Sequence, residues 1–152
     1  MEQIIHQGTL LAIIVRRDFQ RQGTTFFTPE HLSQQLGFLH HPAGHVIEPH
    51  VHLPASREVL FTQEVLFLRR GRLQVDFYDA GQRYLRSEVL EAGDVILLAA
   101  GGHGFTVLEE VEMFEVKQGP YGGDEEKRRF VPGSAEGAGG AGPEGGSPCG
   151  SR

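Results

Sequence analysis

Cysteine is almost absent from this chain of 152 residues. The only one is Cys149, close to the C-terminus. A single cysteine excludes a disulfide within the chain and favours a reducing compartment. Long apolar runs are also missing. The run from Leu10 to Val15 is far too short to cross a membrane, and Glu2 stands where a secretory signal would carry positive charge. The sequence therefore predicts a cytoplasmic protein without a membrane partner.

Positive charge is scarce as well. The chain has 14 Lys and Arg against 20 Asp and Glu, which gives a net charge of -6. Binding to a phosphate backbone needs a basic face, so no nucleic-acid partner is expected. The hydrophobic content of 39% and the charged content of 22% are ordinary for a globular protein. A chain of this length is expected to form one domain.

The composition changes sharply at Pro132. From there to the C-terminus the chain is dominated by Gly, Ala, Ser and Pro, and almost nothing in it could bury apolar surface. Glycine also loses the most conformational entropy when it is ordered. We therefore expect a folded domain over residues 1–131 and a disordered tail over residues 132–152.

The folded part reads as short strands separated by turns. Runs rich in β-branched and aromatic residues alternate with Gly, Pro and Asp, which is typical of an all-β sandwich or barrel. One short helix is predicted to begin at Thr28-Pro29-Glu30, with Thr28 as its N-cap. The expected strands are Leu10–Arg16, Leu36–His40, His45–His52, Val59–Thr62, Glu64–Arg69, Leu73–Tyr78, Tyr84–Leu90, Asp94–Leu98, Gly104–Leu108 and Val111–Lys117.

Two histidines in the sequence Glu48-Pro49-His50-Val51-His52 indicate a metal site. In a strand, residues two apart share a face, so His50 and His52 could take adjacent positions on one metal ion. Glu64 opens the next strong strand and could supply a third ligand. A fourth could come from His103, where the preceding glycines allow a tight turn.

These residues resemble the two motifs of the cupin family. The first motif, Gly-x5-His-x-His followed by Glu-x6-Gly, is matched by Gly44, His50, His52, Glu64 and Gly71. The second is matched approximately by Gly93, Gly101 and His103. The resemblance covers residues 44–107. It implies a cupin-type double-stranded β-helix (a jelly-roll barrel) with one metal ion held by His50, His52, Glu64 and His103.

The carboxylate ligand has a competitor. Eleven residues separate His52 from Glu64, a wider gap than the family usually has, and Glu58 lies within it. Glu64 is preferred because its spacing to Gly71 fits the motif and because it stands at a strand start. Glu58 remains the alternative.

The last predicted strand offers candidates for substrate binding. In Val111–Lys117, the residues Glu115 and Lys117 share one face, opposite to Phe114 and Val116. This face is either solvated or turned into the barrel, where Glu115 and Lys117 would bind a polar substrate. The apolar run from Leu10 to Val15 also has two interpretations: it closes the chain's own barrel, or it extends a partner's sheet in a homodimer.

The ligand set suits one divalent transition metal ion, Fe, Mn, Ni or Zn, without selecting among them. We expect an enzyme that acts on a small polar metabolite, sugar-like or carboxylated, by isomerase, epimerase or lyase chemistry. The alternatives are an Fe(II)-dependent oxygenase and a non-catalytic cupin that binds a small molecule. The fold alone does not decide among them, because it hosts many chemistries.

Overall fold

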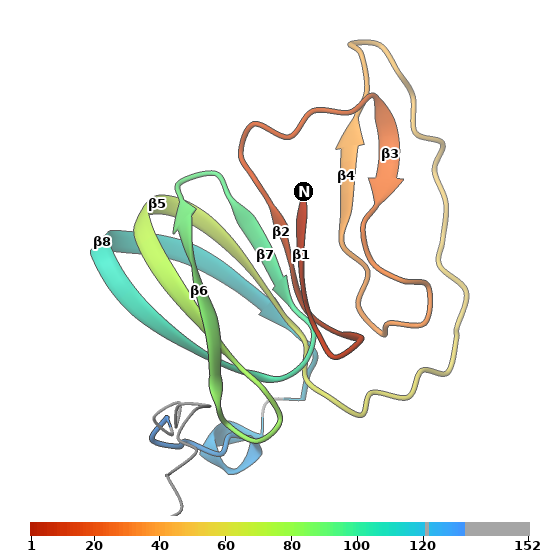
Figure 1. Ribbon diagram of the computed structural model, residues 1–152. Coiled ribbons are helices and arrows are strands. Elements are labelled where there is room, and N and C mark those ends of the chain that lie inside the picture. The colour runs from red at the N-terminus through yellow and green to blue at the C-terminus, as the bar shows by residue number, and fades with distance from the viewer. Residues whose placement is uncertain (121, 133–152) are drawn as a thin grey trace, which may run out of the picture.

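The computed structural model describes residues 1–120 and 122–132 and is built almost entirely of antiparallel strands (Figure 1). No α-helix occurs within these ranges, which confirms the expected all-β class. The strands are β1 (Glu2–His6), β2 (Thr9–Val15), β3 (Gly23–Phe26), β4 (Gly37–His40), β5 (Glu64–Tyr78), β6 (Tyr84–Glu91), β7 (Val95–Leu98) and β8 (Gly102–Lys117), followed by the 3-10 helix η1 (Gly123–Glu126).

Strand β5 organises the main sheet. The sheet has the order β1-β2-β7-β5-β6, and β8 pairs with the other edge of β5. On the shared edge, β7 pairs with the first residues of β5 and β6 pairs with its last residues. Strand β8 follows β5 over nearly its whole length. The hairpin of β3 and β4 forms a separate two-stranded sheet.

The long strands β5 and β8 bend into a strongly curled half-barrel (Figure 1). Their pairing register shifts between Leu68 and Leu73, which marks β-bulges at the bend. Gly71 lies there with φ at +85°, and a Cβ on it would approach the carbonyl oxygen of Glu110 to 2.0 Å. Only glycine fits this position, because it tolerates positive φ and has no side chain.

The core lies on both faces of β2. One cluster of buried side chains, with Ile14 and Ala12 from β2, fills the concave side of the curled sheet. A second cluster, with Ile13 and Val15, packs against residues of the loops before and after β3, among them Phe19 and Phe27. The apolar run from Leu10 to Val15 is therefore buried on two sides. Since β2 pairs with β1 and β7, neither of its edges remains to extend a partner's sheet.

The structure departs from the expected elements between β4 and β5. No strand occurs in residues 41–63, although strands were predicted at His45–His52 and Val59–Thr62. This segment runs in an extended path beside the β3–β4 hairpin, away from the curled sheet (Figure 1). The helix predicted at Thr28 is also wrong. There the Thr28 hydroxyl accepts a hydrogen bond from the Leu36 amide and donates one to Gln35, so it closes a loop.

Two further expectations concern the C-terminal tail and membrane-spanning segments. Of the expected tail, only Pro132 lies within the described residues. No helix among the described residues combines the length and apolar character needed to cross a membrane.

Candidate functional site

A cleft of 680 Å³ opens where the two ends of β5 approach each other. Glu64 at the start of β5 and Tyr78 at its end both line it, together with His103 at the start of β8 and Lys117 at its end. A straight strand of this length would separate its ends by roughly 45 Å. The bend at Gly71 removes that separation, so the curl of the sheet creates the cleft.

The strand register decides which side chains face the cleft. Glu64 pairs with Lys117, and Phe77 pairs with His103. Paired residues share a face of a sheet, and Phe77 belongs to the buried cluster on the concave side. Glu64, Lys117 and His103 therefore project from the concave face.

The side chains of Glu64 and His103 meet across the cleft. His103 Nε2 lies 3.2 Å from Glu64 Oε2, and the side chains are 29% and 9% exposed. The hydrogen bond from His103 holds the pKa of Glu64 below its usual range, although burial acts in the opposite direction. The charges of His103, Lys127 and Lys117 add to the lowering of this pKa. Glu64 is therefore an ionised carboxylate at neutral pH.

The two predicted substrate-binding residues lie at the end of β8. Lys117 Nζ is 3.2 Å from Glu115 Oε1, with the side chains 23% and 43% exposed. Glu115 pairs with Leu66, which is buried in the core, so its backbone position belongs to the concave face as well. Lys117 lines the cleft, whereas Glu115 is not one of the lining residues and reaches the cleft only through its contact with Lys117.

A C-terminal segment, Gly122–Pro132, borders the cleft, and we call it the strap. Lys127, Arg128, Arg129, Phe130 and Pro132 of the strap are among the lining residues. The Phe130 ring meets Tyr78 edge-on, with centroids 5.2 Å apart at 87°. A Cβ on Gly102 would come within 3.1 Å of the Phe130 ring, so the ring rests on the bare backbone of this glycine. Lys127 Nζ lies 3.8 Å from Glu64 Oε1.

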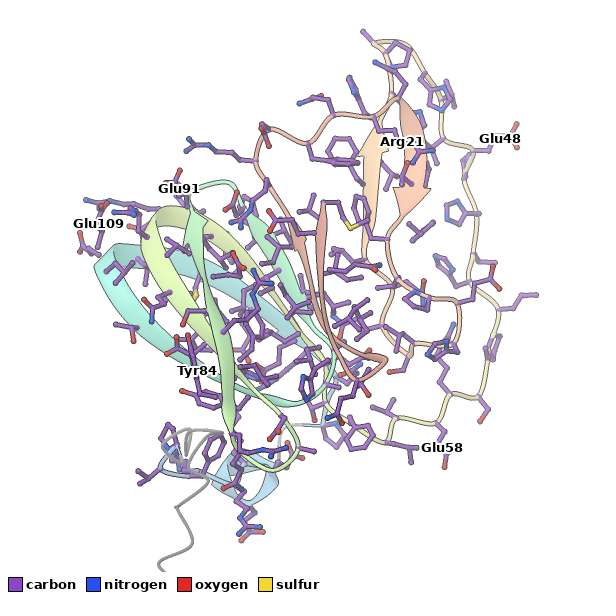
Figure 2. All side chains as sticks on the ribbon, in the orientation of Figure 1. Arg21, Glu48, Glu58, Tyr84, Glu91 and Glu109 are labelled. Carbon is purple, nitrogen blue, oxygen red and sulfur yellow. The ribbon has the colours of Figure 1, made fainter. Side chains whose placement is uncertain are left out.

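The structure brings two of the four predicted metal ligands together and leaves the other two apart. His50 and His52 lie in the exposed segment 41–63, with their rings in edge contact at 5.2 Å. His50 Nδ1 is 2.9 Å from the Glu48 carbonyl oxygen. Figure 2 shows this segment, with Glu48 and Glu58 labelled, on the far side of the molecule from Tyr84. Within the described ranges, no group of three or more His, Cys, Asp and Glu side chains is arranged to hold a metal ion.

The Glu64–His103 pair nevertheless has a spacing that suits a metal ion. Ligand bonds of about 2.1 Å at octahedral to tetrahedral angles separate two donor atoms by about 3.0–3.5 Å. The observed distance of 3.2 Å between Nε2 and Oε2 lies in that range. The pair therefore fits two positions of a metal site, and further ligands are needed to complete it.

Glu58, the alternative carboxylate, lies elsewhere. It lines a second cavity of 490 Å³ with His31, Ser33 and Gln63. It is exposed, whereas Glu64 is buried beside His103. The geometry gives Glu58 no place in the Glu64–His103 cleft.

The strap was not expected to contribute to the site. Its only sequence signal is the basic run Lys127-Arg128-Arg129 followed by Phe130, directly before the glycine-rich tail. The run has no strand or helix periodicity, and its partners Glu64 and Tyr78 are distant in sequence. The only sequence signal for a contribution of the strap to the site was therefore a cluster of cations next to an aromatic residue at the end of the domain.

Comparisons of this chain with family models, with curated proteins and with solved structures find no match.

Proposed function

We propose that this chain is an enzyme that moves a proton on a small polar metabolite bound in the cleft, by isomerase, epimerase or lyase chemistry. The observation that carries the proposal is the buried, ionised carboxylate of Glu64 beside the ring of His103 in an open cleft. Carboxylate–imidazole pairs of this kind serve as general acid–base groups.

The roles of the two residues follow from their protonation. An ionised carboxylate can only accept hydrogen bonds, so His103 Nε2 donates to Glu64. In a neutral ring the free electron pair then sits on Nδ1, which accepts a proton from a carbon next to a carbonyl group. Glu64 stabilises the imidazolium that forms, as a buried carboxylate does in other imidazole pairs. In an isomerisation the imidazolium returns the proton to a neighbouring carbon, and in an elimination it gives the proton to the leaving group as that group's bond to carbon breaks. Epimerisation needs in addition a proton donor on the opposite face of the carbon. None of these reactions needs an oxidant.

Lys117 and Glu115 are proposed to hold the substrate. An ammonium group suits a carboxylate or phosphate, and a carboxylate accepts hydrogen bonds from hydroxyl groups. Their mutual distance of 3.2 Å presents both groups side by side at the cleft. Replacement of Lys117 by Ala is expected to weaken substrate binding by about 1.5–3 kcal/mol, the contribution of one charge-assisted hydrogen bond.

The proposed fold is the cupin-type jelly roll. Support comes from Gly71 and Gly101, two motif glycines with φ of +85° and +75° at a bend and at a turn beside the cleft. A cytoplasmic location and a homodimer remain predictions from the sequence.

Proton movement can be followed without knowing the reaction. A thermal-shift screen of sugars, sugar phosphates and hydroxy acids would first supply a ligand. Incubation of that ligand in D₂O with the protein should then exchange a carbon-bound hydrogen, detected by mass spectrometry. His103→Ala should abolish the exchange, and the control His31→Ala should keep it. Undiminished exchange in both His103→Ala and Glu64→Gln would contradict the proposal, and turnover that requires O₂ would favour the oxygenase.

A divalent transition metal ion in the same cleft is the second candidate. The ligand-like spacing of Glu64 and His103 favours it, and His50 and His52 would complete the set if segment 41–63 closed over the cleft. Such an ion, when bound, would polarise a substrate carbonyl as a Lewis acid. The four side chains are of the types that bind Fe, Mn, Ni or Zn.

Elemental analysis of untagged protein tests this second candidate. The second candidate predicts close to one transition metal ion per chain, lost in His52→Ala and reduced in Glu64→Gln. Full metal content in both variants would remove the assignment. Loss of metal in Glu58→Gln with retention in Glu64→Gln would show that Glu58 is the carboxylate ligand.

A further inference from the structure

The lining of the cleft carries more positive than negative charge. Four cations line it, against the two described carboxylates Glu64 and Glu126; the cations are Lys117, Lys127, Arg128 and Arg129. Glu115, which pairs with Lys117, offsets one of them. The chain as a whole has the opposite sign, with a net charge of -6. A local excess of positive charge in a concave site of an acidic protein attracts anions and raises their local concentration.

Most of these cations belong to the strap. The strap is anchored beside the cleft by Phe130, whose ring packs against Tyr78 and over Gly102. This anchor places the basic run Lys127–Arg129 along the mouth of the cleft rather than in bulk solvent. Lys127 reaches Glu64, the buried carboxylate of the acid–base pair. The positive charge is therefore presented next to the groups that would move the proton.

We propose that the ligand of this cleft is an anion, and that Lys127 and Arg128 of the strap bind its carboxylate or phosphate group. The inference rests on the proposed function and names its substrate class: a small metabolite whose anionic group lies under the strap while its reactive carbon faces His103. Arginine and lysine both bind such oxygen groups through charge-assisted hydrogen bonds, and arginine does so with two parallel donors.

Glu64 competes with the ligand for Lys127. In the structure the ammonium group of Lys127 is 3.8 Å from Glu64 Oε1 and the Lys127 side chain is 52% exposed. An entering anion would draw this half-exposed group away from Glu64 and pair with it. The buried carboxylate thus weakens anion binding while it positions His103, and its removal should have the opposite effect to the removal of Lys127.

Isothermal titration of the full chain with inorganic phosphate and with malonate at low salt tests the inference. Wild-type protein should bind at least one of the two probes, and the preferred probe distinguishes a phosphate site from a carboxylate site. Lys127→Ala should weaken this binding about 10-fold or more. The control Arg21→Ala removes one cation at the other end of the molecule (Figure 2) and should leave the affinity unchanged.

The sign of the Glu64 effect is the sharper criterion. Glu64→Gln should tighten binding of the same probe several-fold, and Phe130→Ala should weaken it although the charge is kept. Absence of binding of both probes, or equal affinity in wild type and Lys127→Ala, would overturn the inference. Proton exchange on an uncharged metabolite without anion binding would overturn this inference alone. Intact anion binding without any proton exchange would overturn the proposed function and leave the anion site standing.

Discussion

The curled sheet and the segment over residues 41–63 adjoin at Glu64, yet they differ in almost every physical property. In the sheet, side chains such as Phe77 and Leu73 are 1% exposed. In the segment, Val51 and Leu53 are 83% and 80% exposed, and no strand forms. The first cupin-like motif spans this boundary, so its histidines and its glutamate have separate environments. Residues of one sequence motif are thus not automatically residues of one site.

Proline explains much of the difference. Pro49 and Pro54 flank Val51 and Leu53 and lack the amide hydrogen that a strand ladder needs. Successive amides of a strand point to opposite edges, so prolines five positions apart remove one donor from each edge. Neither edge of the segment offers an uninterrupted ladder. In β5, by contrast, no proline occurs from Glu64 to Tyr78.

The largest expected effect is on stability. Phe77→Ala should lower the free energy of unfolding by about 3–5 kcal/mol, because it leaves a cavity in the core. Val51→Ala should change it by less than about 0.5 kcal/mol, because the side chain is already in water. Chemical denaturation of the two variants measures this contrast. Similar losses in both would mean that the segment is packed on the sheet in solution.

A smaller contrast concerns two glycines with the same backbone conformation. Gly71 and Gly44 have φ of +85° and +84°, but their surroundings differ. A Cβ on Gly71 would collide with the backbone of Glu110, whereas a Cβ on Gly44 would meet nothing within 4 Å. Gly44→Ala should destabilise by about 1–2 kcal/mol at most, from the backbone strain. Gly71→Ala should destabilise by a further 1–3 kcal/mol or so, because Glu110 must move. Equal effects in denaturation experiments would contradict the described bend.

The smallest contrast concerns the order in which trypsin cuts the segment 41–63 and strand β5. Trypsin should cleave after Arg57 before it cleaves at Arg69, Arg70 or Arg72, because those three lie in β5 and Arg57 lies in exposed chain. Mass spectrometry of early digestion products gives the order, and Arg57→Gln is the control. If a metal ion draws His50 and His52 to the cleft, its addition should slow this cut. A first cut within β5 would contradict the assignment of rigid and exposed regions.

Alternation and apolar runs were sufficient to predict most of the sheet. The buried run from Leu10 to Val15, the strands Leu73–Tyr78 and Tyr84–Leu90 and the strand that begins at Glu64 follow from local pattern. Strands β1 and β3 were not predicted, because their residues carry no clear alternation, whereas β4 was predicted as Leu36–His40. The sequence also treated β5 and β8 as pairs of shorter strands, since a strand that continues through a bulge at Gly71 looks interrupted in sequence.

The candidate site was predictable only in part. Glu64 and His103 were assigned to one site by their motif spacing, and they lie 3.2 Å apart. The places of His50 and His52 depended on a strand that does not form in the structure. Lys127 could not be assigned to the site, because its nearness to Glu64 arises from the curl of β5 and the packing of Phe130. Long-range closure of this kind leaves no local pattern in a sequence.

The central claim is that Glu64 orients His103 for proton transfer, and the protonation of the imidazole ring tests it most directly. Long-range ¹H–¹⁵N correlation spectra of the histidine side chains, recorded at a pH where His103 is neutral, distinguish a protonated from a bare ring nitrogen. The account predicts that Nε2 of His103 carries the hydrogen and Nδ1 is bare, and that Glu64→Gln perturbs the Nε2 signal. A neutral ring protonated on Nδ1, or a His103 spectrum unchanged by Glu64→Gln, would contradict it.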